Sequence, residues 1–174
     1  MMEMMSAESE LERLYDGHGQ ALFSFLLNFT RDEQDTRDVL QEVFIKLARQ
    51  PGLPGAARDE RAFLLRLAHN AAIDLMRRRG ARNQSHQRLG LELDSPYAPA
   101  ASPDEAGFRA ELAAALGQLP AEQRAVVHLK LWEDLTFAQI AEALAMPPNT
   151  AASRYRYGLD KLRSLLRPLY EEIK

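Results

Sequence analysis

Hydrophobic residues recur every three or four positions along most of the chain, which is the spacing of one face of a helix. Sustained alternation of apolar and polar residues is missing from the sequence, and β-branched residues are sparse, so a sheet is not expected. The expected fold class is therefore all-α. The apolar positions of the first predicted helix are Leu11, Leu14, Tyr15, Leu22, Phe25, Leu26 and Phe29.

Two further helices are predicted before residue 80. One carries Val39, Val43 and Leu47 and stops at the segment PGLPG, residues 51–55, whose prolines and glycines require a loop. The other begins near Asp59, a suitable N-cap, and ends in three arginines at 77–79. Residues 81–107 then hold three prolines and few large apolar residues. This composition favours a flexible linker between two small domains, 1–80 and 108–174, over a long loop within one domain.

The C-terminal part has the layout of a helix-turn-helix. Pro120 suits a first helical position, and Thr136 with Gln139 forms a capping box. A break at residues 145–149 separates a short helix from a longer one that Asn149 can cap. In DNA-binding proteins of this layout, the second helix enters the major groove.

The last predicted helix has two unlike faces. One face is apolar and carries Ala151, Tyr155, Gly158, Leu162, Leu166 and Leu169. The opposite face carries Asn149, Ser153, Arg156, Asp160, Arg163 and Arg167. Residues 153–167 contain five Lys or Arg and one acid, although the whole chain has 22 Lys and Arg against 25 Asp and Glu. Arg can pair with guanine and Ser can hold phosphate, so the pattern favours DNA binding; a solvated amphipathic helix is the alternative.

Two other polar clusters lie on predicted helices. Arg66, Asn70, Asp74 and Arg77 share one stripe, which suits either a phosphate backbone or plain solvation. Asp38, Gln41, Glu42 and Lys46 form the polar side of the second helix, which could dock a partner helix. Asp38 and Glu42 are one turn apart on one helix with no facing group, so acid–base catalysis is not indicated.

Composition excludes several classes of protein. The chain has no cysteine, which rules out disulfides, iron–sulfur clusters and thiolate zinc sites. Its four histidines lack paired spacing, and no glycine-rich phosphate loop is present, so no metal, no cofactor and no enzymatic activity are expected. No apolar run approaches the ~18 residues of a membrane span, and the acidic N-terminus does not resemble a signal peptide. These features indicate a cytoplasmic protein without membrane insertion.

Three stretches together resemble the bacterial extracytoplasmic-function (ECF) sigma factors, which are small members of the sigma-70 family. They are DVLQEVFIKL at 38–47, RAFLLRLAHNAAIDLMRRR at 61–79, and the segment 116–166 that begins LGQLPAEQR. Their order and separation make the match specific. The resemblance implies two helical domains, sigma regions two and four, that bind core RNA polymerase and direct promoter recognition, promoter opening and transcription initiation.

The resemblance also implies roles for particular residues. Docking on the β′ coiled coil of the polymerase would fall to Asp38, Gln41, Glu42 and Phe44. Reading of the minus-ten element would fall to the loop 51–60 with Arg66, Asn70, Asp74 and Arg77. Reading of the minus-thirty-five element would fall to Asn149, Thr150, Ala152, Ser153, Arg156 and Tyr157. The β flap of the polymerase and an anti-sigma factor are further partners that the resemblance suggests.

The chain departs from the family pattern at several positions. Ala152 stands where the family usually has a basic residue, Ala145 where glycine is usual, and Gly158-Leu159-Asp160 replaces a more basic run. Base contacts therefore cannot be copied from relatives. The alternative function is an autonomous helix-turn-helix regulator that binds a palindromic operator as a homodimer. A purely helical interaction protein would leave the basic face of the last helix unexplained.

Overall fold

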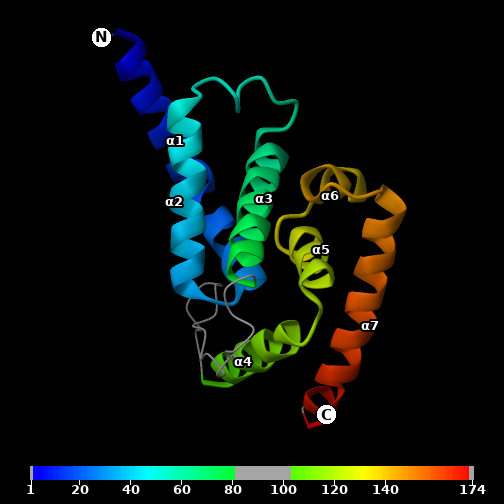
Figure 1. The fold of residues 1–174 in the computed structure, drawn as a ribbon. Helices are drawn as coiled ribbons and strands as arrows, with labels where there is room; N and C mark the ends of the chain where they lie inside the picture. Colours follow the sequence, from blue (N-terminus) through cyan, green and yellow to red (C-terminus); the bar gives the residue numbers. More distant parts are fainter. Residues whose placement is uncertain (1, 81–102, 173–174) are drawn as a thin grey trace.

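The computed structural model describes residues 2–80 and 103–172, and within these ranges every regular element is a helix (Figure 1). The helices are α1 (Met2–Thr30), α2 (Glu33–Arg49), α3 (Glu60–Gly80), α4 (Pro103–Gly117), α5 (Ala121–Leu131), α6 (Phe137–Leu144) and α7 (Pro148–Glu172). The all-α prediction is confirmed. Most of the predicted linker, residues 81–102, lies outside the described residues, whereas residues 103–107 already belong to α4.

Side-chain caps fix where the helices begin. The Asp59 carboxylate accepts a hydrogen bond from the Ala62 amide at 3.0 Å, so it caps α3 as predicted. The predicted capping box is also present, because Thr136 and Gln139 each accept from the other's backbone amide at the start of α6. The last helix begins at Pro148, one residue before the predicted cap Asn149.

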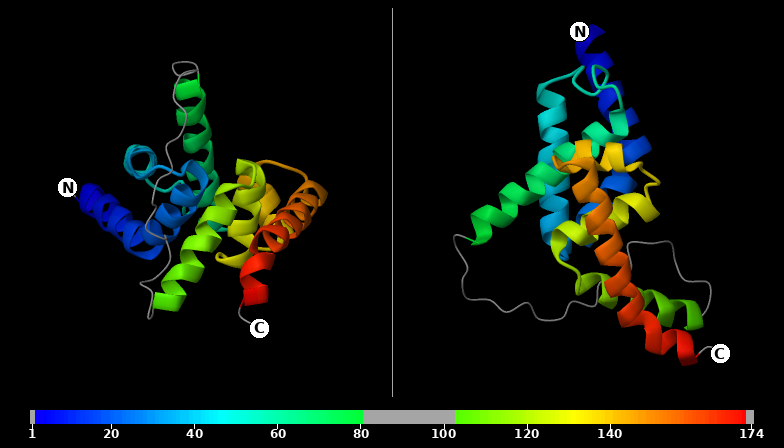
Figure 2. Two further views of the ribbon diagram at one scale, coloured as in Figure 1. Left: turned by 90° about the horizontal axis from the view of Figure 1, so that it is seen from below. Right: turned by 90° about the vertical axis from the view of Figure 1, so that its right-hand side faces the viewer.

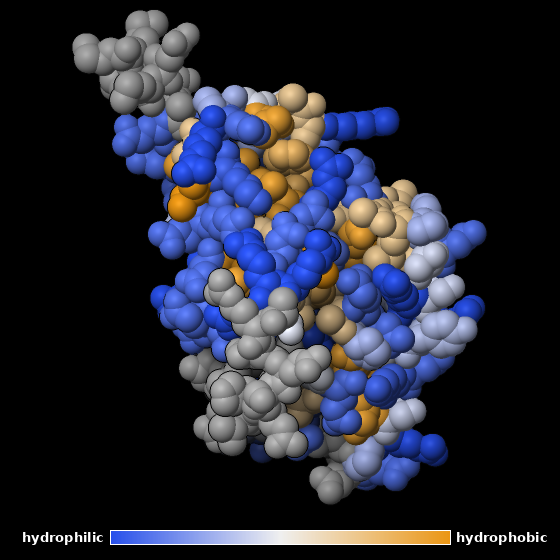
Figure 3. Space-filling view, in the orientation of Figure 1, coloured by the Kyte–Doolittle hydropathy of each residue, from blue (hydrophilic) through white to orange (hydrophobic). Residues whose placement is uncertain are grey.

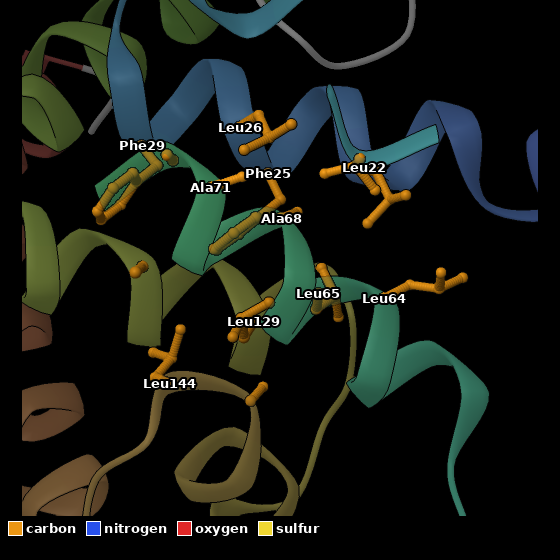
Figure 4. Close-up of a cluster of buried hydrophobic side chains, with 14 of the residues drawn as sticks. Leu22, Phe25, Leu26, Phe29, Leu64, Leu65, Ala68, Ala71, Leu129 and Leu144 are labelled. Atoms are coloured by element: carbon orange, nitrogen blue, oxygen red, sulfur yellow. The ribbon is translucent and has the colours of Figure 1, made fainter. Parts of the chain in front are cut away.

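The first three helices pack around large side chains of α1 and α3. Val39, Val43 and Leu47 of α2 are buried, as their spacing predicts. Fully burying a side chain the size of Phe25 or Phe29 contributes about 2–3 kcal/mol. Figure 4 shows these α1 side chains facing α3; the labelled members are Leu22, Phe25, Leu26, Phe29, Leu64, Leu65, Ala68 and Ala71.

The C-terminal helices form a second cluster. Leu116, Leu119, Val127 and Leu162 bring α4, α5 and α7 together. Figure 2 shows α4 beside the C-terminal end of α7. The face of α7 predicted to be apolar is indeed turned inward at Ala151, Gly158 and Leu162, while the side chain of Leu169 lies outside the described residues.

The two halves of the chain pack against each other. In Figure 1, α5 and α6 lie between α3 and α7. Leu129 of α5 and Leu144 of α6 belong to the same buried cluster as Phe25 and Leu65 (Figure 4). The two predicted domains therefore share a hydrophobic core in this structure.

The outer surface is mainly polar, with separate apolar patches, on the face that Figure 3 presents. Among the described helices, none combines the length and apolar character needed to cross a membrane.

Candidate functional site

The polar side of α2 presents an acidic face. Asp38 and Gln41 are exposed, and Asp38 accepts a hydrogen bond from the Gln34 amide at 2.9 Å. Glu42 is half-buried because Lys46 lies 3.3 Å and Arg78 of α3 lies 3.6 Å from its carboxylate oxygens. Three of the predicted residues thus share one accessible side of the helix, with Glu42 held in place by two cations.

An apolar groove of about 710 Å³ runs beside this face, between α1 and α2. Phe44 lines it together with Tyr15 and Ile45. The prediction that Tyr15 belongs to the buried face of its helix is wrong, since the side chain is 56% exposed. Its ring packs edge-on against Phe44, with centroids 5.2 Å apart, so the two rings form a wall of the groove instead of a core contact.

This groove could not be predicted from the sequence. Two of its lining residues, Tyr15 and Ile45, are exposed apolar side chains, but they lie on two helices that the sequence alone could not place side by side.

The predicted stripe on α3 is accessible along most of its length. Asn70, Asp74 and Arg77 are exposed, and Arg66 is half-buried with its guanidinium 5.6 Å from the centre of the Phe63 ring. Asp74 lies 4.0 Å from Arg77, one turn away. The stripe therefore mixes hydrogen-bonding groups with both charges, which suits contacts with bases as well as with phosphates.

The arginines that end α3 are engaged with α2. Arg78 faces Glu42, and Arg79 forms an ion pair with the largely buried Asp35. Two of the three arginines thus hold α3 against α2. The third, Arg77, is exposed to solvent.

The outward face of α7 is well exposed. Asn149, Arg156 and Tyr157 project to solvent, and the Arg156 guanidinium lies 5.4 Å from the centre of the Tyr157 ring. The remaining predicted residues, Thr150, Ala152 and Ser153, are half-buried beside them. An arginine stacked on an aromatic ring is pre-ordered, which lowers the entropic cost of pairing with a base edge.

Two departures from the family pattern lie in the turn before α7 and on the inner face of that helix. Ala145 ends α6 with φ 52° and ψ 51°, the left-handed conformation that glycine adopts without strain. Gly158 permits close packing, because a methyl group there would lie 2.7 Å from Cγ2 of Val127 on α5. Gly158 thus lies on the inward face, as its spacing predicts, and the close approach to α5 is what its position in the sequence did not indicate.

Ionisable groups gather where the two halves meet. The ring of His128, on α5, is fully buried and packs edge-on against Phe25 with centroids 5.7 Å apart. This burial lowers the pKa of His128 to about 3. Nearby, the His69 ring and Arg154 lower the pKa of the Glu122 carboxyl. The His, Asp and Glu side chains of the described ranges do not gather into a group that could hold a metal ion.

Comparisons with known proteins agree with this layout. The Sigma-70 region 2 family matches residues 14–82, and the Sigma-70 region 4 family matches residues 109–162. The ECF RNA polymerase sigma factor SigL of Mycobacterium tuberculosis is 36% identical over 169 residues, which are 94% of this chain and 93% of SigL. SigX of Bacillus subtilis, also an ECF RNA polymerase sigma factor, is 28% identical over 95% of this chain and 88% of its own.

The fold also matches a solved structure. The sigma factor RpoE from Bartonella quintana, crystallised with the anti-sigma factor NepR, superposes with a TM-score of 0.73. The superposition covers 91% of this chain and 97% of RpoE at 18% identity, so it shows a shared fold.

Proposed function

This chain belongs to the ECF sigma factors of the sigma-70 family. We propose that three exposed helix faces carry its functions: one binds the polymerase and two recognise promoter DNA. The protein binds core RNA polymerase and directs promoter recognition, promoter opening and transcription initiation. In our proposal it supplies specificity without catalysis of its own, and it acts in the cytoplasm beside the polymerase.

The acidic face of α2 docks on the polymerase in this proposal. The observation that carries the assignment is the exposure of Asp38 and Gln41 beside an apolar groove. Interfaces of this kind combine an apolar centre with a polar rim. Phe44 supplies the apolar part, and Glu42, positioned by Lys46 and Arg78, supplies a fixed negative charge. We take the partner surface to be the β′ coiled coil, which should then present apolar and basic residues to this face.

Promoter DNA is read from two other helices. The stripe Arg66, Asn70, Asp74 and Arg77 on α3, with the loop 51–60, contacts the minus-ten element. The outward face of α7 enters the major groove at the minus-thirty-five element. Arg156 is its central base-reading residue, and Asn149, Thr150, Ala152, Ser153 and Tyr157 surround it.

These roles correspond to two domains. We assign residues 1–80 to sigma region two and place the start of region four at Pro103, where α4 begins, instead of at Phe108.

The RpoE structure contains an anti-sigma factor, and we propose such a factor, together with the β flap, as further partners of this chain.

Binding to core polymerase tests the docking face. The double variant Gln41→Ala with Glu42→Ala should lower the affinity for core polymerase about tenfold, because two polar contacts at the rim are removed. The matched control is Gln118→Ala with Glu111→Ala, which removes the same two residue types from an exposed position of α4 and from the exposed residue that follows it, and should leave the affinity unchanged.

The measurement is a binding titration with circular dichroism to verify helicity, followed by in vitro transcription on genomic fragments. Equal affinities for the two double variants would refute the assignment of the docking face. Tight promoter binding by the free chain, without polymerase, would point to an autonomous regulator instead.

A further inference from the structure

One residue on the outward face of α7 has no polar side-chain atom. Among the six positions proposed to face the minus-thirty-five element, Ala152 alone ends in nothing but a methyl group on its Cα. Ala152 is partly exposed, whereas the adjacent Ala151 is completely buried. The methyl group of Ala152 is therefore accessible to a partner of α7, and that of Ala151 is not.

Ala152 lies between two side chains that can read bases. A helix places residues three or four positions apart on the same side, so Asn149, Ala152 and Arg156 form one row along α7. Asn149 and Arg156 are both exposed. In the major groove, asparagine pairs with adenine and arginine pairs with guanine, each through two hydrogen bonds. The row thus has a polar group at each end and a methyl group between them.

The position of Arg156 sets the register of this row. Its guanidinium is pre-ordered by the Tyr157 ring, whose centre is 5.4 Å away. Ala152 precedes Arg156 by four residues, or about 6 Å along the helix axis at ~1.5 Å per residue. Successive base pairs are ~3.4 Å apart along the DNA. With α7 in the major groove, Ala152 therefore faces a base pair within about two steps of the pair that Arg156 reads.

The chemistry of a methyl group selects the base pair opposite it. Alanine offers no side-chain donor or acceptor, so an amino group or carbonyl oxygen placed against it loses water without gaining a partner. The C5 methyl group of thymine needs no such partner, and its contact with alanine buries apolar surface. Thymine alone among the four bases carries a methyl group in the major groove.

We propose that Ala152 is a specificity-determining residue that contacts the C5 methyl group of a thymine within two base pairs of the guanine read by Arg156. This inference rests on the proposed function, because it requires α7 to enter the major groove at the minus-thirty-five element. The preferred element then holds a T·A pair between the pairs read by Asn149 and Arg156. A basic residue, which the family usually has at this position, would favour guanine or a phosphate instead. Ala152 thus gives this chain a promoter preference of its own.

Removal of the methyl group from the DNA tests the proposal. Core polymerase loaded with the natural chain first selects its preferred element from a library that is randomised at the minus-thirty-five positions. Each thymine of that element, on both strands, is then replaced in turn by deoxyuridine, which lacks only the C5 methyl group. One replacement should weaken binding by about fourfold, the effect of one buried methyl group, and the other thymines serve as internal controls.

The position of the sensitive thymine is part of the prediction. It should lie within two base pairs of the guanine whose preference is lost in Arg156→Ala. A selected element with no thymine there, or with no thymine that responds to deoxyuridine, would overturn the proposal.

Variants at position 152 identify the residue that contacts the methyl group. Ala152→Gly removes the side chain, so thymine and deoxyuridine at the sensitive position should bind equally well. Glycine also weakens the helix, but this cost applies to both DNAs and cancels in their ratio. Ala114→Gly, at an exposed position of α4, is the matched control and should keep the fourfold ratio. A fourfold ratio that persists in Ala152→Gly would refute the role of Ala152.

Two further measurements do not depend on the glycine variant. Ala152→Lys should replace the preference for thymine with a preference for guanine in a new selection. With the natural chain, 5-methylcytosine at the sensitive position should bind about fourfold more tightly than cytosine, because it restores a methyl group at the same place in the groove. Equal binding of cytosine and 5-methylcytosine would contradict the proposal.

Arg156→Ala distinguishes a failure of this inference from a failure of the proposed function. Unchanged selection of the minus-thirty-five element by that variant contradicts the assignment of α7 to promoter DNA. Altered selection by that variant, together with no effect of deoxyuridine in the natural complex, keeps the proposed function and refutes the role of Ala152.

Discussion

The two helices proposed to face promoter DNA, α3 and α7, differ in how the rest of the molecule holds them. α3 lies between the halves: it packs on α1 and α2 on one side and on α6 on the other. Its first residues contact Glu133 and Gln139 of the other half, and its last arginines contact α2. α7 packs on α4, α5 and α6, and its outward face carries Arg156 and Tyr157 into solvent.

This difference indicates which substitutions should change DNA binding without changing the stability of the fold. In the proposed assignment, many changes on α3 should alter packing and DNA contact together, because the same helix packs on α1, α2 and α6 and faces DNA. A change on the outward face of α7 should act on DNA contact alone. The predictions that follow test this separation, from the largest expected effect to the smallest.

The largest effect is expected at the centre of the α7 face. Arg156→Ala should lower promoter binding by the polymerase complex by about 1–3 kcal/mol, as expected for an arginine paired with guanine. The melting temperature of the free chain should stay the same, because Arg156 is exposed. Binding to promoter and random DNA at two salt concentrations, with thermal unfolding, checks both parts.

Arg156→Lys distinguishes two modes of contact. If Arg156 reads a base, Lys should lose most of the specificity while keeping binding to random DNA, because it lacks the bidentate fork. A loss of thermal stability in Arg156→Ala would contradict the separation between the two faces of α7.

A second effect concerns the shared core that holds α3. Burial keeps His128 neutral with a pKa of about 3, whereas an exposed histidine titrates near 6.5. The contribution of the neutral His128 to the free energy of unfolding is therefore fully present above pH 6.5. As the pH falls below that value, the unfolded chain takes up a proton that the packed chain does not, so stability decreases by roughly 1.4 kcal/mol per pH unit. Between pH 6.5 and 5 the free energy of unfolding should drop by about 2 kcal/mol.

Urea unfolding at several pH values measures this slope. Glu133, 3.7 Å from His128 and paired with Arg61, favours the protonated ring, but loss of solvent dominates. The depressed pKa values of Glu122 and Glu60 change the free energy of unfolding only below about pH 4.5. They therefore do not contribute to the slope between pH 6.5 and 5. His128→Gln should flatten the slope relative to that of the natural chain. Identical slopes in the variant and the natural chain would show that His128 does not carry the effect.

The smallest effect is expected in the turn before α7. Ala145 has a left-handed backbone, which costs an alanine roughly 1 kcal/mol relative to glycine. Ala145→Gly should therefore raise the free energy of unfolding by about 0.5–1 kcal/mol and leave promoter selection unchanged. Thermal unfolding is the measurement, and a lower melting temperature for this variant would mean that the strain is relieved elsewhere.

The elements of the fold could be predicted from the sequence because they depend on local spacing and capping. Asp59 and the Thr136–Gln139 box begin their helices as predicted, and Val39, Val43 and Leu47 are buried as predicted. The prediction that Tyr15 is buried is wrong because helical spacing shows only which face a residue lies on. The spacing is the same whether that face packs into the core or lines a groove.

The contacts between the halves could not be predicted. Arg124 and His128 lie on a helix whose sequence contains nothing unusual, and their burial depends on the end of α1, about one hundred residues away. Spacing within a helix indicates which side is buried but does not identify the helix that covers it. The accessible residues of the candidate surfaces on α2, α3 and α7 were easier to identify, because exposure follows from the same helical period.

The shared hydrophobic core has a consequence for how long the protein survives in a cell. Separating the halves uncovers Phe25, Leu129 and Leu144, which are almost completely shielded in the packed chain. Large exposed apolar patches promote aggregation and attract proteases. A chain whose halves have separated should then be cleared before a chain whose halves are packed. Substitutions that loosen the packing between the halves should therefore shorten the half-life of the protein.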